Sequence, residues 1–143
     1  MQINFSRKDI SSEPSGFDMG DISIEFGNER ISSQDSPRNL MMIYIAIADL
    51  IFGVLELKDR NGSYEFVGAD SSFIVNFKTK GRFLEISQKN GVKFVCNWSE
   101  FLGSLCSSVK EFLASGNNLK SSDSANLDLQ LAIEKLKKAK PGV

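Results

Sequence analysis

The sequence of 143 residues contains no histidine. This absence excludes nucleophiles activated by a histidine base, histidine general-base catalysis and the commonest protein ligand of zinc. Cysteine is also scarce, because only Cys96 and Cys106 are present. Two cysteines supply neither a zinc site nor a disulfide framework, so we expect two buried thiols in a reducing compartment. No glycine-rich phosphate-binding loop appears either, and we expect no cofactor and no metal.

The chain also lacks a hydrophobic run long enough to cross a membrane. Its most apolar stretch, residues 39–57, is interrupted by Asp49, whereas a membrane-spanning helix needs about 18 apolar residues with few charges. Small or polar residues recur there at steps of four, three and four, as on one stripe of a helix: Asp49, Gly53, Glu56 and Arg60. The remaining circumference is apolar, which is typical of a helix packed on several sides. We therefore predict a core helix over residues 37–58, capped by Asp35 or Ser36 before Pro37.

The chain has no large excess of positive or negative charge, because it holds 17 basic and 18 acidic residues. The formal net charge is −1, and no apolar segment follows a basic start at the N-terminus. We therefore expect a cytoplasmic protein without a secretory signal and without a general attraction to membranes or nucleic acid. Residues 1–36 differ from the rest, because they hold seven acidic and three basic side chains, a net charge of −4. Such a segment is often only solvated surface, but it also suits an acidic face that meets a basic partner.

Alternating apolar and polar residues predict β-strands on both sides of the core helix. Before the helix, the sequences MQINFS and DISIEFGN predict two strands, with a loop over residues 9–20 between them. After it, residues 63–96 are typical of an antiparallel meander of four strands. Asn90 and Gly91 predict a tight hairpin turn in which both central residues have positive φ. The aromatic residues of the meander are expected to face the core: Phe66, Phe73, Phe77, Phe83 and Phe94.

Residues 97–140 are typical of two further helices. Asn97 and Glu100 have the spacing of a capping box at the start of the first, and Gly116 is a suitable stop. Together the segments predict one α+β domain over residues 1–143: an antiparallel sheet of about five to six strands, with the long apolar helix and two further helices packed against it. Its parts are N-terminal strands with an acidic loop (1–36), the core helix (37–58), the meander (63–96) and the C-terminal helices (97–140).

Two acidic residues are candidates for chemistry, and each also has a structural interpretation. Asp70 in the turn GADSS could bind an ion, but Asp and Ser in such turns usually satisfy nearby backbone groups. Asp49 could be a general acid with a raised pKa, but such a group more often caps a loop or pairs with a base. Carboxylate pairs such as Glu65 and Glu85 arise easily among 18 acidic residues. We predict that the chain is not an enzyme.

Direct binding of nucleic acid is not expected. Basic residues gather near the predicted sheet turns: Lys78, Lys80, Arg82, Lys89 and Lys93. The aromatic residues between them alternate as core residues, whereas an RNA-binding sheet exposes its aromatic side chains. The net charge of −1 points the same way.

The order of several segments carries a resemblance over about residues 20–115. These segments are the strand DISIEF, the apolar helix LMMIYIAIADLIFGVLEL, the strand pair YEFVGADSSFIVNF and the helix start NWSEF. In this order the chain resembles the small cytoplasmic immunity proteins of bacterial toxin–immunity systems, in particular those of contact-dependent growth inhibition. The resemblance implies a protein without a reaction of its own. Such a protein binds one cognate toxin domain, often a nuclease, and blocks its active site or its access to substrate.

Under this resemblance the acidic N-terminal segment is the candidate toxin-binding surface. A nuclease carries basic residues that hold phosphates, and an inhibitor can present carboxylates in their place. Attraction between the two surfaces would also speed capture of the toxin. We therefore predict that these carboxylates contact the toxin: Asp18, Asp21, Glu25, Glu29 and Asp35.

Two other classes of function stay open. A small enzyme that works through carboxylates would show a deep pocket with clustered acidic residues. A secretion chaperone or adaptor would show a large exposed apolar patch, and such proteins usually form homodimers. The sequence predicts neither the identity of the toxin nor the number of chains that assemble.

Overall fold

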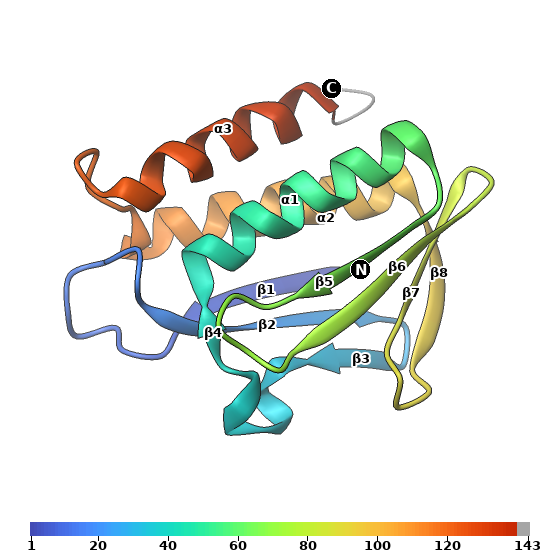
Figure 1. The fold of residues 1–143 in the computed structure, drawn as a ribbon, viewed down its shortest axis with the longest axis horizontal. Helices are drawn as coiled ribbons and strands as arrows, with labels where there is room; N and C mark the ends of the chain where they lie inside the picture. Colours follow the sequence, from blue (N-terminus) through green and yellow to red (C-terminus); the bar gives the residue numbers. More distant parts are fainter. Residues whose placement is uncertain (140–143) are drawn as a thin grey trace.

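The computed structural model describes residues 1–139 and has the predicted α+β class (Figure 1). Three helices lie above two antiparallel sheets, with α1 and α2 between α3 and the strands. The end of the predicted C-terminal part, residues 140–143, lies outside the described residues. The elements are β1 (Gln2–Arg7), β2 (Met19–Phe26), β3 (Glu29–Ser32), η1 (Ser33–Asp35), η2 (Pro37–Asn39), β4 (Met41–Met42), α1 (Ile43–Arg60), β5 (Ser63–Val67), β6 (Ile74–Lys80), β7 (Phe83–Ser87), β8 (Lys93–Asn97), α2 (Trp98–Phe112), η3 (Leu113–Asn117) and α3 (Ser124–Ala139).

The strands form two sheets instead of the single sheet that the sequence predicts. Sheet A has the order β1-β2-β3, and β4 also pairs with β2; sheet B has the order β5-β6-β7-β8. The meander over residues 63–96 is therefore a sheet by itself, and the N-terminal strands do not extend it. Two short strands, β3 and β4, account for the difference. Gly27 has a φ of 59°, which lets the chain reverse directly after β2 and pair Glu29 with Phe26.

Helix α1 begins later than predicted, at Ile43 instead of Pro37. Pro37 instead opens the single turn η2, whose preceding residue Ser36 accepts a hydrogen bond from the Arg38 backbone N–H at 3.3 Å. Half of the residues of α1 are fully buried, including Tyr44, Leu50 and Val54, in one core that both sheets share. The most apolar segment is thus a core helix, as predicted. None of the helices within residues 1–139 combines the length and apolarity that crossing a membrane requires.

The start of α2 confirms the predicted cap but not the full capping box. The side-chain oxygen of Asn97 accepts a hydrogen bond from the Glu100 backbone N–H at 2.7 Å. The Glu100 carboxylate lies instead 3.4 Å from the Met1 ammonium group. The cap therefore fixes the helix start, while Glu100 links α2 to the beginning of β1.

Helix α2 covers the outer edge of β1. The Ser108 hydroxyl donates a hydrogen bond to the Ile3 carbonyl, and the Ser104 hydroxyl donates one to the Met1 carbonyl at 3.3 Å. Backbone carbonyls at a sheet edge otherwise remain open to water or to another strand. The serines of α2 therefore satisfy carbonyl groups along this edge.

Two details of sheet B differ from the sequence prediction. The β7–β8 turn is wider than a two-residue hairpin, because the Gln88 N–H donates to the Val92 carbonyl at 2.9 Å. Gly91 has a φ of 100°, but Asn90 does not have positive φ. Phe83 is the second exception, because it is 45% exposed while the other four predicted core aromatics are buried. Leu84 and Ile86 of β7 face the core. Because side chains alternate along a strand, Phe83 points outward.

The two cysteines are both free thiols, and they differ in exposure. Cys96 is buried, and this burial raises the pKa of its thiol to about 12, with a smaller contribution from the Glu100 carboxylate. Cys106 is only half-buried, which differs from the prediction of two buried thiols. We expect a thiol reagent such as DTNB at neutral pH to react with Cys106 in the folded protein and with Cys96 only after denaturant is added. Cys106→Ser should abolish the fast reaction, and fast reaction of both thiols would contradict this assignment.

Candidate functional site

The candidate site is the outer face of sheet A, because two of the predicted carboxylates, Asp21 and Glu25, lie there together. Ile22 and Ile24 of β2 point into the core, so the residues between them point away from it. In Figure 1 the three helices lie above the strands, and Gln2, Asn4 and Ser6 of β1 on this face are exposed. We define the outer face of sheet A by these residues: Gln2, Asn4, Ser6, Met19, Asp21, Ser23, Glu25 and Arg30.

An open hollow of about 270 Å³ lies on this face. Small polar side chains dominate its lining: Asn4, Ser6, Asp21, Ile22, Ser23, Glu25, Arg30 and Gln34. Asp21 accepts a hydrogen bond from the Ser33 hydroxyl at 2.7 Å, and Glu25 lies 3.4 Å from the Arg30 Nε. The Glu25 and Arg30 side chains are each about half exposed, so water screens the pair and both groups can still pair with another charged surface. The hollow therefore offers polar contacts and carboxylates on a rigid central strand.

The structure brings together only two of the five predicted carboxylates. Asp21 and Glu25 share the outer face of sheet A. Glu29 pairs with Phe26 in the β2–β3 register, and Phe26 contacts Phe94 inside the molecule at a ring distance of 5.3 Å, so Glu29 belongs to the opposite face. Asp35 is exposed on η1 and does not line the hollow.

Asp18 is engaged inside the protein and is not a free surface acid. Its carboxylate lies 2.9 Å from the Arg7 Nη1 and also accepts a hydrogen bond from the Ser15 backbone N–H at 2.9 Å. The Arg7 side chain is only 3% exposed, and its Nε donates to the Asn117 side chain at 2.9 Å. Sequence reasoning missed this cluster. The signal was available, because Arg7 continues the inward alternation of Ile3 and Phe5 along β1.

The two acids considered for chemistry have ordinary structural settings. Asp49 is on the exposed stripe of α1, where partial burial and then the Asp128 carboxylate raise its pKa, and no basic side chain pairs with it among the described residues. Asp70 is exposed in a turn with a φ of 56°. In that turn the Ser71 hydroxyl accepts a hydrogen bond from the Phe73 backbone N–H at 3.0 Å, as the structural interpretation of GADSS predicts. Across residues 1–139, His, Cys, Asp and Glu form no group of three or more that could hold a metal ion.

The carboxylates of the predicted sheet pair are not neighbours. Glu65 is on β5 and Glu85 on β7, and β6 lies between these two strands. Glu85 is instead 4.0 Å from Lys80, on the outward side of sheet B. Lys78, Lys93 and Glu65 share that side, so the outer surface of sheet B carries three lysines and two glutamates. Acidic and basic side chains therefore occur together on both sheet faces, with Asp21, Glu25 and Arg30 on sheet A.

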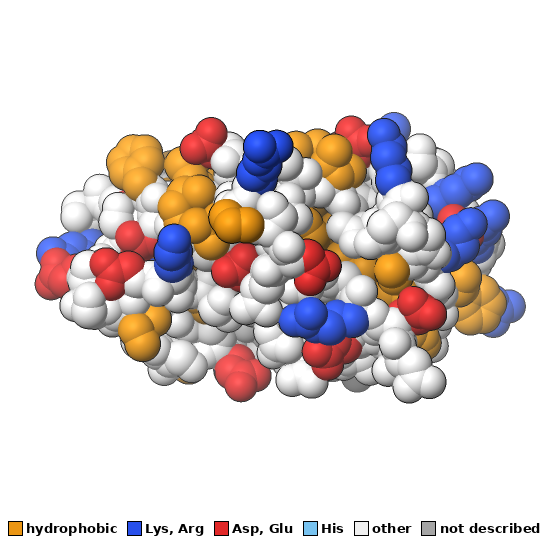
Figure 2. Space-filling view, turned by 90° about the horizontal axis from the view of Figure 1, so that it is seen from below, with side chains coloured by type: hydrophobic (Ala, Val, Ile, Leu, Met, Phe, Trp, Pro, Cys, Tyr) orange, Lys and Arg blue, Asp and Glu red, His pale blue; other side chains and the backbone are white. Residues whose placement is uncertain are grey.

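Figure 2 shows the molecule from below, with acidic and basic side chains interspersed and hydrophobic side chains toward both the left and the right end. Neither a protein-family model, nor a curated protein, nor a solved structure matches the chain. The class that the geometry defines is an α+β protein with two open sheet faces, of which the outer face of sheet A carries two of the five predicted carboxylates, Asp21 and Glu25.

Proposed function

We propose that the chain is an immunity protein that binds a cognate bacterial toxin domain and covers its active site, without a reaction of its own. The observation that carries this proposal is the placement of Asp21 and Glu25 on β2, the central strand of sheet A, in an uncovered polar face. A strand paired on both sides holds its side chains in fixed positions, which favours binding by surface complementarity. The proposal places the protein in the cytoplasm, where an incoming nuclease toxin would meet its substrate.

A nuclease is the kind of toxin that suits this face best. Its active-site cleft must be basic, because it holds the phosphates of a nucleic acid. Asp21 and Glu25 would take the place of phosphates, and the small side chains beside them leave room for long arginine or lysine side chains. Exposed opposite charges would also raise the rate of association at low salt.

The test uses a candidate toxin domain, taken from a toxin gene next to the gene for this chain. Stopped-flow fluorescence measures the association rate constant for the wild type and for the double variant Asp21→Lys/Glu25→Lys at rising salt concentrations. We expect the double variant to associate about tenfold more slowly at low salt and to show a weaker salt dependence. Asp21→Asn/Glu25→Gln is a milder second variant, because it keeps the size of both side chains.

A matched control reverses two acids on the helices, Glu56→Lys and Glu134→Lys, which changes the net charge equally. Glu56 lies on α1 and Glu134 on α3, and both are exposed. Equal association rates for the two double variants would remove the outer face of sheet A from the interface. A wild type that does not bind the toxin domain would contradict the proposed function itself.

A secretion chaperone or adaptor is a second candidate function, favoured by apolar side chains on the outer side of α3. Leu127 and Leu131 are four residues apart on this helix and both are exposed. A homodimer in sedimentation equilibrium that Leu127→Glu disrupts would favour this candidate over the immunity protein.

A further inference from the structure

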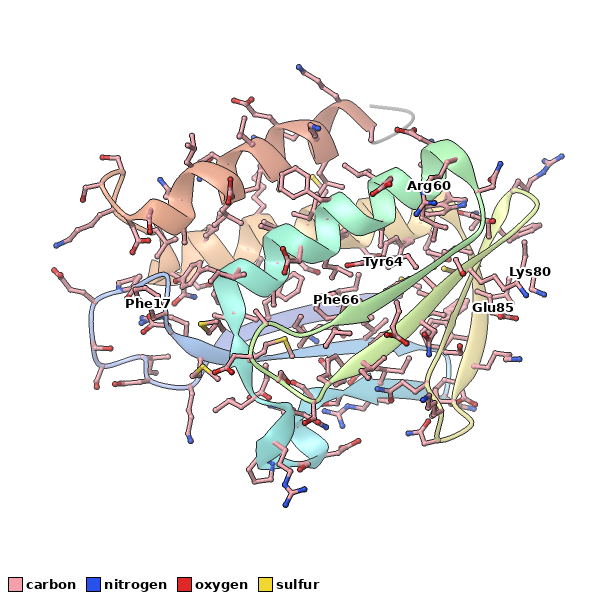
Figure 3. All side chains as sticks on the ribbon, viewed as in Figure 1. Phe17, Arg60, Tyr64, Phe66, Lys80 and Glu85 are labelled. Atoms are coloured by element: carbon pink, nitrogen blue, oxygen red, sulfur yellow. The ribbon has the colours of Figure 1, made fainter. Side chains whose placement is uncertain are left out.

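Phe17 is the most exposed aromatic side chain in the described part of the chain, with 75% of its surface open to water. It lies on the loop over residues 8–18 that connects β1 to β2, at the left end of the molecule in Figure 3. A phenylalanine normally contributes to a core, because removing it from water stabilises the folded state by about 1.5–3 kcal/mol. At this position the folded monomer gains only a minor part of that stabilisation.

The loop that carries Phe17 is held firmly against the rest of the protein. Gly16 is buried, and its backbone N–H donates to the Asp123 carboxylate at 2.9 Å. A Cβ on Gly16 would lie 2.6 Å from the Cβ of Ala125, so the loop touches the start of α3 closely. The Asp18 backbone N–H donates to the Ser15 carbonyl at 2.9 Å, which closes a turn with Phe17 at its tip.

Arg7 fixes both halves of the loop from below. Its Nη1 donates to the Ser12 carbonyl at 3.2 Å and to the Asp18 carboxylate at 2.9 Å. Asp18 is fixed in turn to the start of α1, because its carbonyl accepts a hydrogen bond from the Ile43 backbone N–H at 2.9 Å. Phe17 is therefore an aromatic side chain held in water on a rigid support. Such a side chain loses little conformational freedom when a partner binds it.

Phe17 comes two residues before Met19, which belongs to the outer face of sheet A. Met19 opens β2 and pairs with Met42 of β4, so the two side chains share one face, and each is half-buried. Further along the same face of β2 come Asp21 and Glu25. One of the hydrophobic groups visible in Figure 2 is at the left end, which is the end of the molecule where Figure 3 labels Phe17. An apolar anchor beside a polar, charged region is the usual composition of a protein–protein interface.

We infer that Phe17 is the hydrophobic anchor of the toxin interface and enters an apolar pocket that basic side chains surround. This inference rests on the proposed function and adds to it the contact that supplies most of the affinity. The acids near Phe17 in the chain indicate the charge of the partner: Asp9 and Glu13 precede it in the loop, where Glu13 lies 3.0 Å from Lys120, and Asp21 follows it on β2. Interface energy concentrates in a few such buried aromatic contacts, while surrounding contacts are nearly neutral.

The experiment is isothermal titration of the same toxin domain into the wild type, Phe17→Ala and Phe83→Ala. Phe83 is the matched control, because it is also an exposed phenylalanine but lies on the outer surface of sheet B, paired with Lys80, which Figure 3 labels at the opposite end of the molecule. We expect Phe17→Ala to raise the Kd about 30-fold or more, mainly through faster dissociation, and Phe83→Ala to leave it nearly unchanged. The melting temperature should stay the same for Phe17→Ala, because the side chain makes few contacts in the monomer.

Three other outcomes would overturn the inference in distinguishable ways. Equal Kd values for Phe17→Ala and the wild type, together with weaker binding by the Asp21 and Glu25 variants, would remove the anchor and leave the proposed function standing. No binding by the wild type would remove both. A wild-type dimer that Phe17→Ala converts to a monomer, with toxin binding unchanged, would show that a second copy of the chain covers Phe17.

Discussion

Replacing Gly20 with alanine is expected to destabilise the folded chain by about 3 kcal/mol. A Cβ at this position would lie 2.0 Å from the Ser6 carbonyl oxygen and 2.9 Å from the Cβ of Ile43. Both contacts are far shorter than non-bonded atoms allow. The Ser6 oxygen belongs to the backbone of β1, so it cannot move without disturbing the β1–β2 pairing. Urea denaturation followed by circular dichroism would measure the loss.

Gly53→Ala is the comparison that tests the reason for this effect. A Cβ on Gly53 would lie 2.0 Å from the Tyr64 ring, which rests against α1. The ring is the far end of a side chain and can turn away, at the cost of the hydrogen bond that its hydroxyl donates to the Asp49 carbonyl at 3.1 Å. We therefore expect a smaller loss of stability for Gly53→Ala than for Gly20→Ala. The reverse order would show that backbone contact is not what makes Gly20 necessary.

Replacing Arg7 with methionine is expected to lower the free energy of unfolding by about 3 kcal/mol. The variant keeps the apolar stem but removes the guanidinium group, which leaves the Asp18 carboxylate without its cation. The Asn117 side-chain oxygen and the Ser12 carbonyl lose their donor as well. Thermal and urea unfolding measure the stability. Chymotrypsin supplies a local readout, because a freed loop should be cleaved after Phe17 much faster than in the wild type.

Two further variants separate the ion pair from a general effect of losing an arginine. Arg60→Met removes an exposed pair with Glu56 and should change the stability by less than about 0.5 kcal/mol. Arg7→Met/Asp18→Asn should regain part of the lost stability, because the uncompensated charge is gone. An Arg7→Met variant as stable as Arg60→Met would contradict the role of Arg7 as the support of the loop.

The elements that the sequence predicts well are those with a clear period. The stripe along α1 and the alternation in β2 and sheet B each repeat over enough residues to identify the element and its buried side. The Asn97 cap is equally local, because the donor and acceptor are three residues apart. These signals suffice for the α+β class and for a helix at the centre of the core.

The arrangement into two sheets could not be predicted from the sequence, because the shortest strands contain too few residues to show an alternation of apolar and polar side chains. The strand β4 has two residues, and only its pairing with Met19 and Gly20 makes it a strand. This pairing also takes the place of the first turn of the predicted helix, since residues 37–42 become η2 and β4 before α1 begins. Tertiary contacts thus decide the structure where local preference is weak.

The candidate site divides in the same way. Strand alternation alone places Asp21 and Glu25 on one face and is readable from the sequence. The ion pair between Asp18 and Arg7 cannot be read from the sequence in this way. It depends on the burial of Arg7 against Asn117, a residue 110 positions further along the chain. The same long-range contact positions Phe17. A hydrophobic residue in a turn-rich loop gives no sign in the sequence that the fold will present it rigidly to solvent.

The serine hydroxyls of α2 that meet β1 have a consequence for self-association. The Ser104 and Ser108 hydroxyls donate hydrogen bonds to the carbonyls of Met1 and Ile3. An extended segment of a second molecule would have to displace both hydroxyls before it could pair with this edge of β1. Amyloid fibrils grow when a new strand forms backbone hydrogen bonds with the unpaired edge of an existing strand. Helix α2 therefore blocks the addition of a further strand at the β1 edge of sheet A.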